Sequence, residues 1–295
     1  MLAIHYDSSF DGFLSVVFEI YRQHLDVGDI VPVRPYAAEG AAAPDLFLQP
    51  FRVESDEESA RRLRRAILNM AGEDILSLLD CAFRSEEPGI EMKIFAYLRK
   101  LFAQEGRNYA RNPTSDEMLP LFTVARSVRR EQGFMLGAVR FGKAPDGMYI
   151  SAIEPKYNVV DMLAPHFRSR FPNGRWAIVD VRRRYGICYE GGQVQLVSVD
   201  DPEAIAGIER SDEFARMWKS YYDSMAIKER LNPELLRRCL PVRYWKHLTE
   251  RQVDASSLTI GGRKSEKRGA DGLGGANLPS AVAQNSSLAL SHSCM

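Results

Sequence analysis

The chain has 295 residues, 45% of them hydrophobic and 26% charged, which is the composition of an ordinary soluble protein with a substantial core. It holds 39 Lys and Arg against 39 Asp and Glu, so its net charge singles out no class of partner. No apolar run of 18 residues exists, which excludes a membrane-spanning helix.

The charges are unevenly distributed along the chain. Residues 1–90 carry 8 basic and 16 acidic side chains, whereas residues 111–190 carry 13 and 8, and residues 214–251 carry 9 and 4. An acidic first third and a basic remainder indicate either two parts that pack together or a basic surface left free for an anion. The sequence leaves both interpretations open.

The cysteines and glycines predict neither a metal nor a cofactor. The cysteines stand far apart, at Cys81, Cys188, Cys239 and Cys294. No CxxC, GxGxxG or GxxxxGK[ST] motif is present, so zinc, iron–sulfur and nucleotide cofactors have no support. Acidic residues interrupt the apolar N-terminus, so we expect no ordinary signal peptide and a cytoplasmic, reducing location.

The first 125 residues predict a mainly helical part. A short strand is expected over residues 2–6, followed by a helix from Ser8, and residues 26–53 are interrupted by prolines around an extended piece near 46–51. Apolar periodicity predicts further helices from Ser55, over 73–83 and over 91–105. The arginine-rich run of residues 61–65 favours a solvated helix face over a nucleic-acid surface.

Residues 126–200 predict a sheet-containing core. A helix over 117–130 precedes strands over 135–141 and 148–153, a helix over 158–171, and strands over 175–181, 185–190 and 193–199. This order predicts a central antiparallel sheet backed by helices, and hence the α+β class.

Residues 201–251 predict a helical closure. One helix is expected from Ser211 to about Leu231, and a second follows Asn232 and Pro233. Residues 241–246 are expected to dock Trp245 against the core. The glycine- and serine-rich composition predicts a disordered tail over 252–295, so we expect a single α+β domain over residues 1–251.

Arginines beside aromatic and apolar residues are the main candidates for a nucleic-acid surface. They are Arg126, Arg129, Arg130, Arg140, Arg170 and Arg183. The first three fall at helical spacing and can share one surface, where they either pair with acids of the first third of the chain or grip phosphates. Arg140 lies on a predicted strand, where it either covers the sheet or projects into a groove.

His166 and Asp180 are the only candidates for acid–base chemistry that the pattern offers. His166 and Arg170 are four residues apart on a predicted helix, and Asp180 ends a predicted strand. Together with nearby arginines they form a hypothetical general acid–base group for phosphodiester or base substrates. The alternative is a structural pair, or no contact at all.

Three stretches carry a family resemblance: YDSSFDGFL over residues 6–14, the arginine-rich core over 126–189, and RLNP with PVRYWK over 230–233 and 241–246. Over roughly residues 1–251 the chain resembles a bacterial family associated with DNA metabolism and DNA repair. Its members are typically encoded beside a radical-SAM protein, and some are fused to a uracil-DNA glycosylase-like domain.

The resemblance implies a DNA-binding accessory protein that works with a radical-SAM partner. A nuclease or glycosylase-like enzyme and a non-catalytic scaffold for that partner remain alternatives. About two residues after the pair that corresponds to Arg130 and Glu131, family members usually carry a histidine, where this chain has Gln132 and Gly133. In addition, Ala138 replaces a usual aromatic residue. These departures weaken the expectation of an enzyme.

Overall fold

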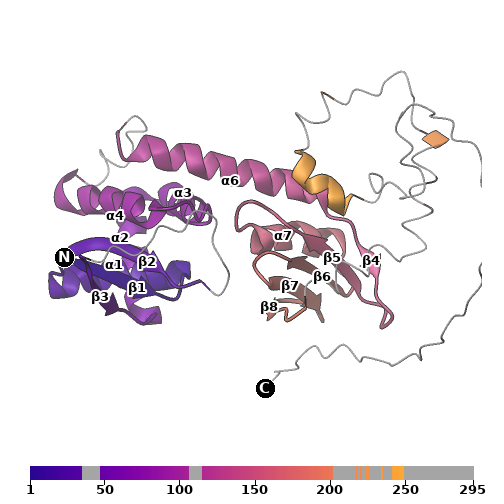
Figure 1. Cartoon of the computed structure of the whole chain (residues 1–295), viewed down its shortest axis with the longest axis horizontal. Helices are drawn as coiled ribbons and strands as arrows, with labels where there is room; N and C mark the ends of the chain where they lie inside the picture. Colours follow the sequence, from indigo (N-terminus) through magenta and orange to yellow (C-terminus); the bar gives the residue numbers. More distant parts are fainter. Residues whose placement is uncertain are drawn as a thin grey trace, which may run out of the picture.

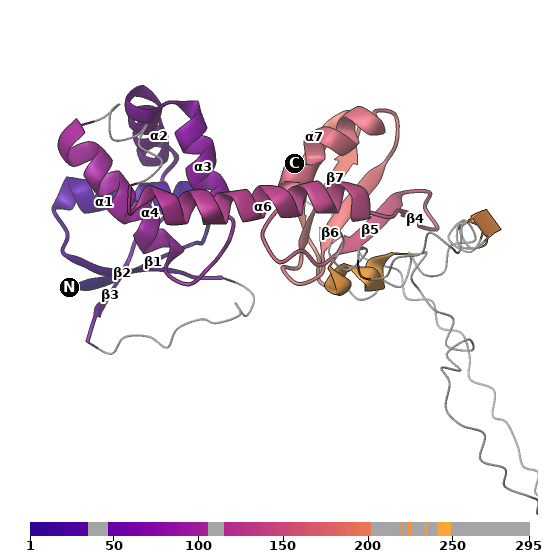
Figure 2. The same ribbon diagram turned by 90° about the horizontal axis from the view of Figure 1, so that it is seen from above.

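The computed structural model describes residues 1–34, 47–105, 115–201 and 241–248, with the single residues Met217, Ser220, Ser224, Met225 and Glu234. Two sheets with their helices are joined by one long helix, α6 (Met118–Ala138), which runs from one to the other (Figures 1 and 2). We call residues 1–125 the N-terminal lobe, and residues 126–201 with 241–248 the C-terminal lobe. The predicted α+β class is confirmed.

The sheet of the N-terminal lobe has three parallel strands in the order β2-β1-β3. They are β1 (Leu2–Tyr6), β2 (Val27–Pro32) and β3 (Gln49–Arg52). The sequence indicated β1 and an extended piece near β3, but no sheet. Parallel strands pair across long connections, so their pairing leaves no local sequence pattern.

Before α6, the described part of this lobe also contains the helices α1 (Phe10–Gln23), α2 (Glu57–Ala71), α3 (Glu73–Phe83) and α4 (Ile90–Lys100) and the π-helical turn η1 (Leu101–Glu105). The cap of α1 is Ser9 rather than the predicted Ser8, because the Ser9 hydroxyl accepts a hydrogen bond from the Gly12 amide at 2.9 Å. Asp56 caps α2 in the same way through the Ser59 amide.

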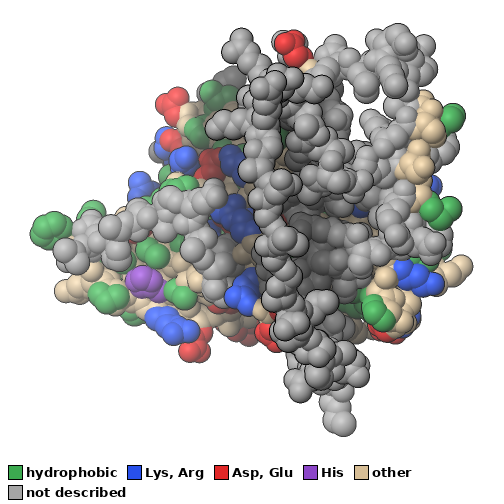
Figure 3. All heavy atoms as spheres, turned by 45° about the vertical axis from the view of Figure 1, so that its right-hand side comes forward, with side chains coloured by type: hydrophobic (Ala, Val, Ile, Leu, Met, Phe, Trp, Pro, Cys, Tyr) green, Lys and Arg blue, Asp and Glu red, His purple; other side chains and the backbone are tan. Residues whose placement is uncertain are grey.

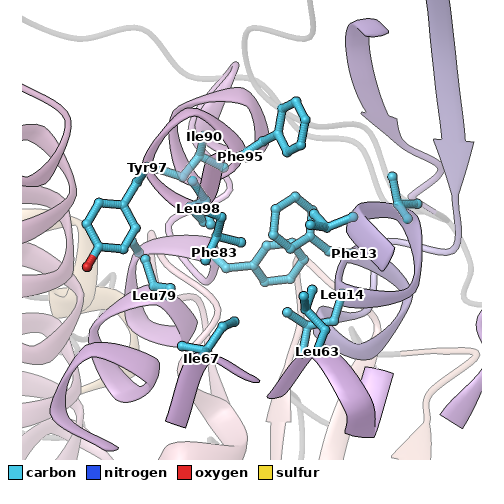
Figure 4. Close-up of a cluster of buried hydrophobic side chains, with 14 of the residues drawn as sticks. Phe13, Leu14, Leu63, Ile67, Leu79, Phe83, Ile90, Phe95, Tyr97 and Leu98 are labelled. Atoms are coloured by element: carbon cyan, nitrogen blue, oxygen red, sulfur yellow. The ribbon is translucent and has the colours of Figure 1, made fainter. Parts of the chain in front are cut away.

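The helices enclose an apolar core drawn in Figure 4, where side chains of α1, α2, α3 and α4 meet. Phe83 lies at its centre, with ring centroids 5.3 Å from Phe10 and 5.6 Å from Phe13. Ile67 and Leu79 are fully buried beside it. The helical periodicity seen in the sequence therefore corresponds to this core.

The sheet of the C-terminal lobe has five strands in the order β4-β5-β6-β7-β8. They are β4 (Gly142–Lys143), β5 (Tyr149–Ile153), β6 (Trp176–Asp180), β7 (Tyr185–Glu190) and β8 (Gln193–Ser198). The predicted antiparallel pairing holds for three of the four strand pairs, whereas β5 and β6 pair in parallel. Helix α7 (Val160–Arg170) connects these two strands and allows the chain to return in the same direction.

Helix α6 belongs to both cores. Its early buried residues, such as Leu121 and Ala125, join the N-terminal core, whereas Val128 and Met135 join the C-terminal core. The predicted strand over 135–141 is wrong, because α6 continues to Ala138 and β4 is only two residues long. The apolar residues of this stretch fit both the period of a strand and the period of a helix. The helix forms because it buries Met135 and Ala138.

The described end of the chain is the short 3-10 helix η3 (Val242–His247), which packs on the C-terminal core. Tyr244 is fully buried there, whereas Trp245 is only partly buried. The helices predicted from Ser211 and Asn232 lie outside the described residues except for a few single positions, and the tail over 252–295 lies wholly outside them. The single domain over 1–251 stays a prediction.

Candidate nucleic-acid interface

The outward face of α6 carries three exposed arginines, Arg126, Arg129 and Arg130. Val128 and Glu131, at intervening helical positions, are buried on the opposite side. At about 100° per residue the three guanidinium groups fall on one side of the helix. They lie where α6 passes from the first core to the second, a segment that the ribbons in Figures 1 and 2 show spanning the two lobes.

These three arginines are not neutralised by carboxylates in the described part of the chain. Arg129 donates a hydrogen bond to the Ser77 hydroxyl at 3.2 Å, and the Arg130 guanidinium lies over the Phe134 ring at 5.3 Å from its centroid. Arg126 has no hydrogen bond or ion pair among the described residues. Their positive charge is therefore available to an external anion.

The arginine run of α2 behaves differently. Three of its four arginines form ion pairs, Arg61 with Glu57, Arg62 with Glu58, and Arg64 with Asp11, whereas the exposed Arg65 has no ion pair among the described residues. This arrangement is the solvated helix face that the sequence favoured, and most of its positive charge is compensated. The arginines of α2 are therefore weaker candidates for phosphate binding than those of α6.

Arg140 and Arg170 lie at the ends of two helices. The Arg140 Nη1 donates to the backbone carbonyls of Gly137 at 2.7 Å and Val139 at 3.2 Å, so Arg140 caps the C-terminus of α6 instead of lying on a strand. Arg170 is exposed in the last turn of α7. On the face drawn in Figure 3, the visible basic side chains are interspersed with acidic and hydrophobic ones.

Arg183 is buried, which contradicts its predicted role in phosphate contact. Its side chain has no exposed area, and Nε and Nη2 both donate to Glu86, at 3.0 and 2.8 Å. Nη1 donates to Asp180 at 2.7 Å and to the Pro155 carbonyl at 3.1 Å. The guanidinium therefore joins the α3–α4 turn of one lobe to the β6–β7 turn of the other.

A second arginine, Arg84, strengthens this junction. It follows α3 and donates to Asp80 at 2.9 Å and to Asp161, at the start of α7, at 2.6 Å. The Asn158 side chain adds a hydrogen bond to Glu86 at 3.1 Å. The Glu86–Arg183 pair joins an acid of the first third to a base of the remainder, as one of the two interpretations of the charge distribution expected, whereas the Arg84–Asp161 pair has the opposite polarity.

His166 and Asp180 do not form an acid–base group. Asp180 is fully buried at the end of β6, where burial raises its pKa and the Arg183 charge opposes that rise. His166 is exposed on α7 beside Phe167, which packs against Trp176 at the start of β6. No hydrogen bond or ion pair joins His166 to Asp180, which is the alternative of no contact that the sequence left open.

A shallow depression of about 530 Å³ lies beside the end of α7. It is lined by Pro165, Arg168, Ser169, Pro172, Tyr189 and Gly192. Its polar side chains are the Arg168 guanidinium, the Ser169 hydroxyl and the Tyr189 phenol, which donates a hydrogen bond to the Pro172 carbonyl at 2.8 Å, and the lining holds neither a carboxylate nor an imidazole. Among the described residues no cluster of three or more histidine, cysteine or acidic side chains is placed to hold a metal ion.

The sequence missed the buried partners of Glu131. Glu131 directly follows Arg129 and Arg130 in the sequence, but its carboxylate is buried and accepts hydrogen bonds from the Lys156 amide and the Tyr244 hydroxyl. The helical period contained a signal, since Glu131 falls three residues after Val128 and four before Met135 on the buried stripe.

No helix in the described part of the chain has the length and apolarity needed to cross a membrane.

Comparison with known proteins places most of this structure in one family. The model of a domain of unknown function, DUF4130, matches residues 88–250, which is more than half of the chain. The protein therefore belongs to the DUF4130 family. The matched region contains α4, α6 and all of the C-terminal lobe, whereas β1–β3 and α1–α3 precede it. No curated protein and no solved structure matches the chain.

Proposed function

We propose that the protein is an accessory factor of DNA repair or DNA metabolism that binds nucleic acid through arginine–phosphate contacts. The observation that carries this proposal is the outward face of α6, where Arg126, Arg129 and Arg130 stand exposed and without carboxylate partners in the described chain. Arginine binds phosphate oxygens through two parallel hydrogen bonds, and such contacts position a protein on nucleic acid without reading its bases.

The same proposal includes a radical-SAM partner. The support is the family resemblance in the arginine-rich core, and the described residues hold no cluster of three cysteines that would ligate an iron–sulfur centre in this chain. In this arrangement the partner carries the chemistry and this protein holds the nucleic acid. Arg170 is a secondary phosphate contact, because it is exposed but belongs to the last turn of α7 and not to α6.

Binding affinity measured as a function of salt concentration tests the phosphate contacts. Replacing Arg126, Arg129 and Arg130 by Gln should lower the slope of log K against log salt by about 2 to 3 for duplex DNA, at about 0.9 per lost phosphate contact. The matched control replaces Arg61, Arg62 and Arg64 by Gln. It removes the same charge from a compensated face and should leave the slope unchanged.

Two results would reject the proposal. One is no binding of single- or double-stranded DNA at low salt, and the other is an equal loss of slope in both triple variants, which would indicate a net-charge effect without specific contacts. Co-purification with the radical-SAM protein, with and without DNA, tests the partner separately. Association that needs neither DNA nor the α6 arginines would favour a scaffold.

A further inference from the structure

Two hydrophobic side chains share the outward face of α6 with the arginines. Leu119 is 55% exposed and Phe122 is 47% exposed, although their helical neighbours Met118 and Leu121 are buried. Phe122 precedes Arg126 by four residues, so the ring lies about 6 Å along the helix axis from that arginine's position and on the same side. An exposed aromatic ring therefore adjoins three uncompensated guanidinium groups.

The ring has no structural role that the described residues explain. No ring contact or cation–π contact of Phe122 occurs within the described part of the chain, in contrast to Phe134, whose ring lies under Arg130. A single exposed phenylalanine is common on protein surfaces. Phe122, however, lies on the same helix face as three arginines without carboxylate partners. The ring and the arginines supply the two features that nonspecific binding of single-stranded nucleic acid needs, a stacking platform and phosphate contacts.

We propose that this face of α6 binds single-stranded DNA in preference to the duplex. Phe122 stacks on one unpaired base, and Arg126, Arg129 and Arg130 contact phosphates of the adjoining nucleotides. This inference rests on the proposed function and adds the class of substrate. In a duplex the bases are stacked on each other and expose only their edges in the grooves, so the Phe122 ring would have no base face to contact.

The geometry of the helix favours a strand that runs along it. Arg126 and Arg130 are one turn apart, and the next two outward positions are Gly133 and Gly137. No heavy atom of the described residues would lie within 4 Å of a Cβ atom added at either glycine, so no described side chain covers α6 at these two positions. The charged part of this face spans the turn from Arg126 to Arg130, and the two glycines continue the face without side chains of their own.

Fluorescence anisotropy with the full chain tests the inference. The probes are a labelled oligothymidylate of about 16 nucleotides and a duplex of the same length. We expect the wild type to bind the single strand more tightly. Phe122→Ala should lower single-strand affinity roughly ten-fold, because base–aromatic stacking contributes about that much per base, and should leave the duplex affinity and the salt slope unchanged.

Two variants control for shape and hydrophobicity. Phe122→Trp keeps a stacking ring and should retain the single-strand affinity, whereas Leu119→Ala removes a comparably exposed aliphatic group and should change it far less. Thermal unfolding of each variant verifies that it is folded. A duplex preference of the wild type, an equal loss on both probes, or an unchanged affinity of Phe122→Ala would overturn the inference. Binding that depends on the arginines but not on Phe122 rejects this inference alone, whereas absence of all binding rejects the proposed function with it.

Discussion

The Tyr244 hydroxyl donates a hydrogen bond to the carboxylate of Glu131, in the middle of α6, although the two residues are 113 positions apart. Tyr244 is 1% exposed and Glu131 is 2% exposed. Burial raises the pKa of Tyr244, and the neighbouring Glu131 raises it further, so the phenol remains a donor throughout the physiological range. This contact ties η3 to the helix that both lobes share.

We expect Tyr244→Phe to lower the free energy of unfolding by about 1–3 kcal/mol, because it removes one partner of a buried carboxylate and little volume. Tyr244→Ala should cost about 3–5 kcal/mol, since a buried ring is also lost. Urea denaturation followed by circular dichroism measures both.

The neighbouring tryptophan is the control for this prediction. The sequence indicated Trp245 as the residue that docks the closing segment. Trp245 is partly buried and packs against the C-terminal core, whereas Tyr244 is buried within that core. Trp245→Ala should therefore destabilise the protein less than Tyr244→Ala. The opposite order of stabilities would show that the sequence-based expectation was right.

Local patterns predicted the helices well and the sheets incompletely. The periodicity of α2, α3 and α4 lies within each helix, so it can be seen in sequence and corresponds to the core around Phe83. The pairing of β1 with β2 and β3 brings together segments separated by helix α1 and a long connection, and no local pattern encodes it. The parallel β5–β6 pair was missed for the same reason.

The exposure of the candidate site's arginines could be predicted only for those on α6, where the helical period determines which side chains face the solvent. Arg126, Arg129 and Arg130 lie opposite Val128, and this relationship follows from the spacing alone. Arg183 carries the same charge in the sequence, but its burial depends on Glu86, which is 97 positions away. Composition could not distinguish an arginine that holds two lobes together from one that is free to contact a phosphate.

Removal of Arg183 should strongly destabilise the protein. Arg183→Met keeps most of the side-chain volume but leaves the buried Asp180 carboxylate without its charge partner, which we expect to cost about 3–5 kcal/mol. The matched control Arg168→Met removes an exposed arginine and should change stability by less than about 0.5 kcal/mol. A small effect of Arg183→Met would indicate that water replaces the guanidinium.

The same variant should respond to acid in a defined direction. The pKa of Asp180 is already raised by burial, and loss of Arg183 removes the charge that opposes this rise. A carboxyl whose pKa is raised on folding stabilises the protein when protonated and loses that contribution as pH increases through the raised pKa. The difference in the free energy of unfolding between the wild type and Arg183→Met should therefore become smaller as pH falls toward about 4. Adding Asp180→Asn to the same variant should remove this pH dependence.

Asp7 should contribute stability of the opposite pH dependence. Partial burial alone would raise its pKa, but hydrogen bonds from the Ser55 hydroxyl at 2.6 Å and from the amide and hydroxyl of Ser9 at 3.0 and 2.7 Å lower it below the ordinary value. A lowered pKa means that the contribution is present above the unfolded-state value and is lost as pH falls through the folded-state value.

Replacement of this carboxylate tests that sign. Asp7→Asn should be less stable than the wild type at pH 7, and the difference should diminish below about pH 4 as the wild-type carboxyl becomes protonated. Asp74→Asn controls for the loss of one carboxylate elsewhere in the lobe. A difference between Asp7→Asn and the wild type that stays constant down to pH 2 would contradict the assignment.

Replacing Gly133 or Gly137 by alanine should stabilise the protein. Both lie within α6, and no atom of the described residues would lie within 4 Å of a Cβ at either position. Glycine in a helix interior costs about 0.5–1 kcal/mol relative to alanine, so each Gly→Ala change should raise stability by about that amount. The melting temperature should rise by about 2–4 °C per kcal/mol for a folded region of this size.

Gly186 in β7 is the contrasting control. A Cβ there would lie 2.5 Å from the Ile178 carbonyl oxygen and 3.0 Å from the Val179 Cα atom, and neither backbone atom can move without disturbing β6. Gly186→Ala should therefore destabilise the protein by about 1–3 kcal/mol, as overpacking does. If Gly133→Ala and Gly137→Ala were also destabilising, the outward face of α6 would be covered, and both the exposure of its arginines and the stacking surface at Phe122 would have to be reconsidered.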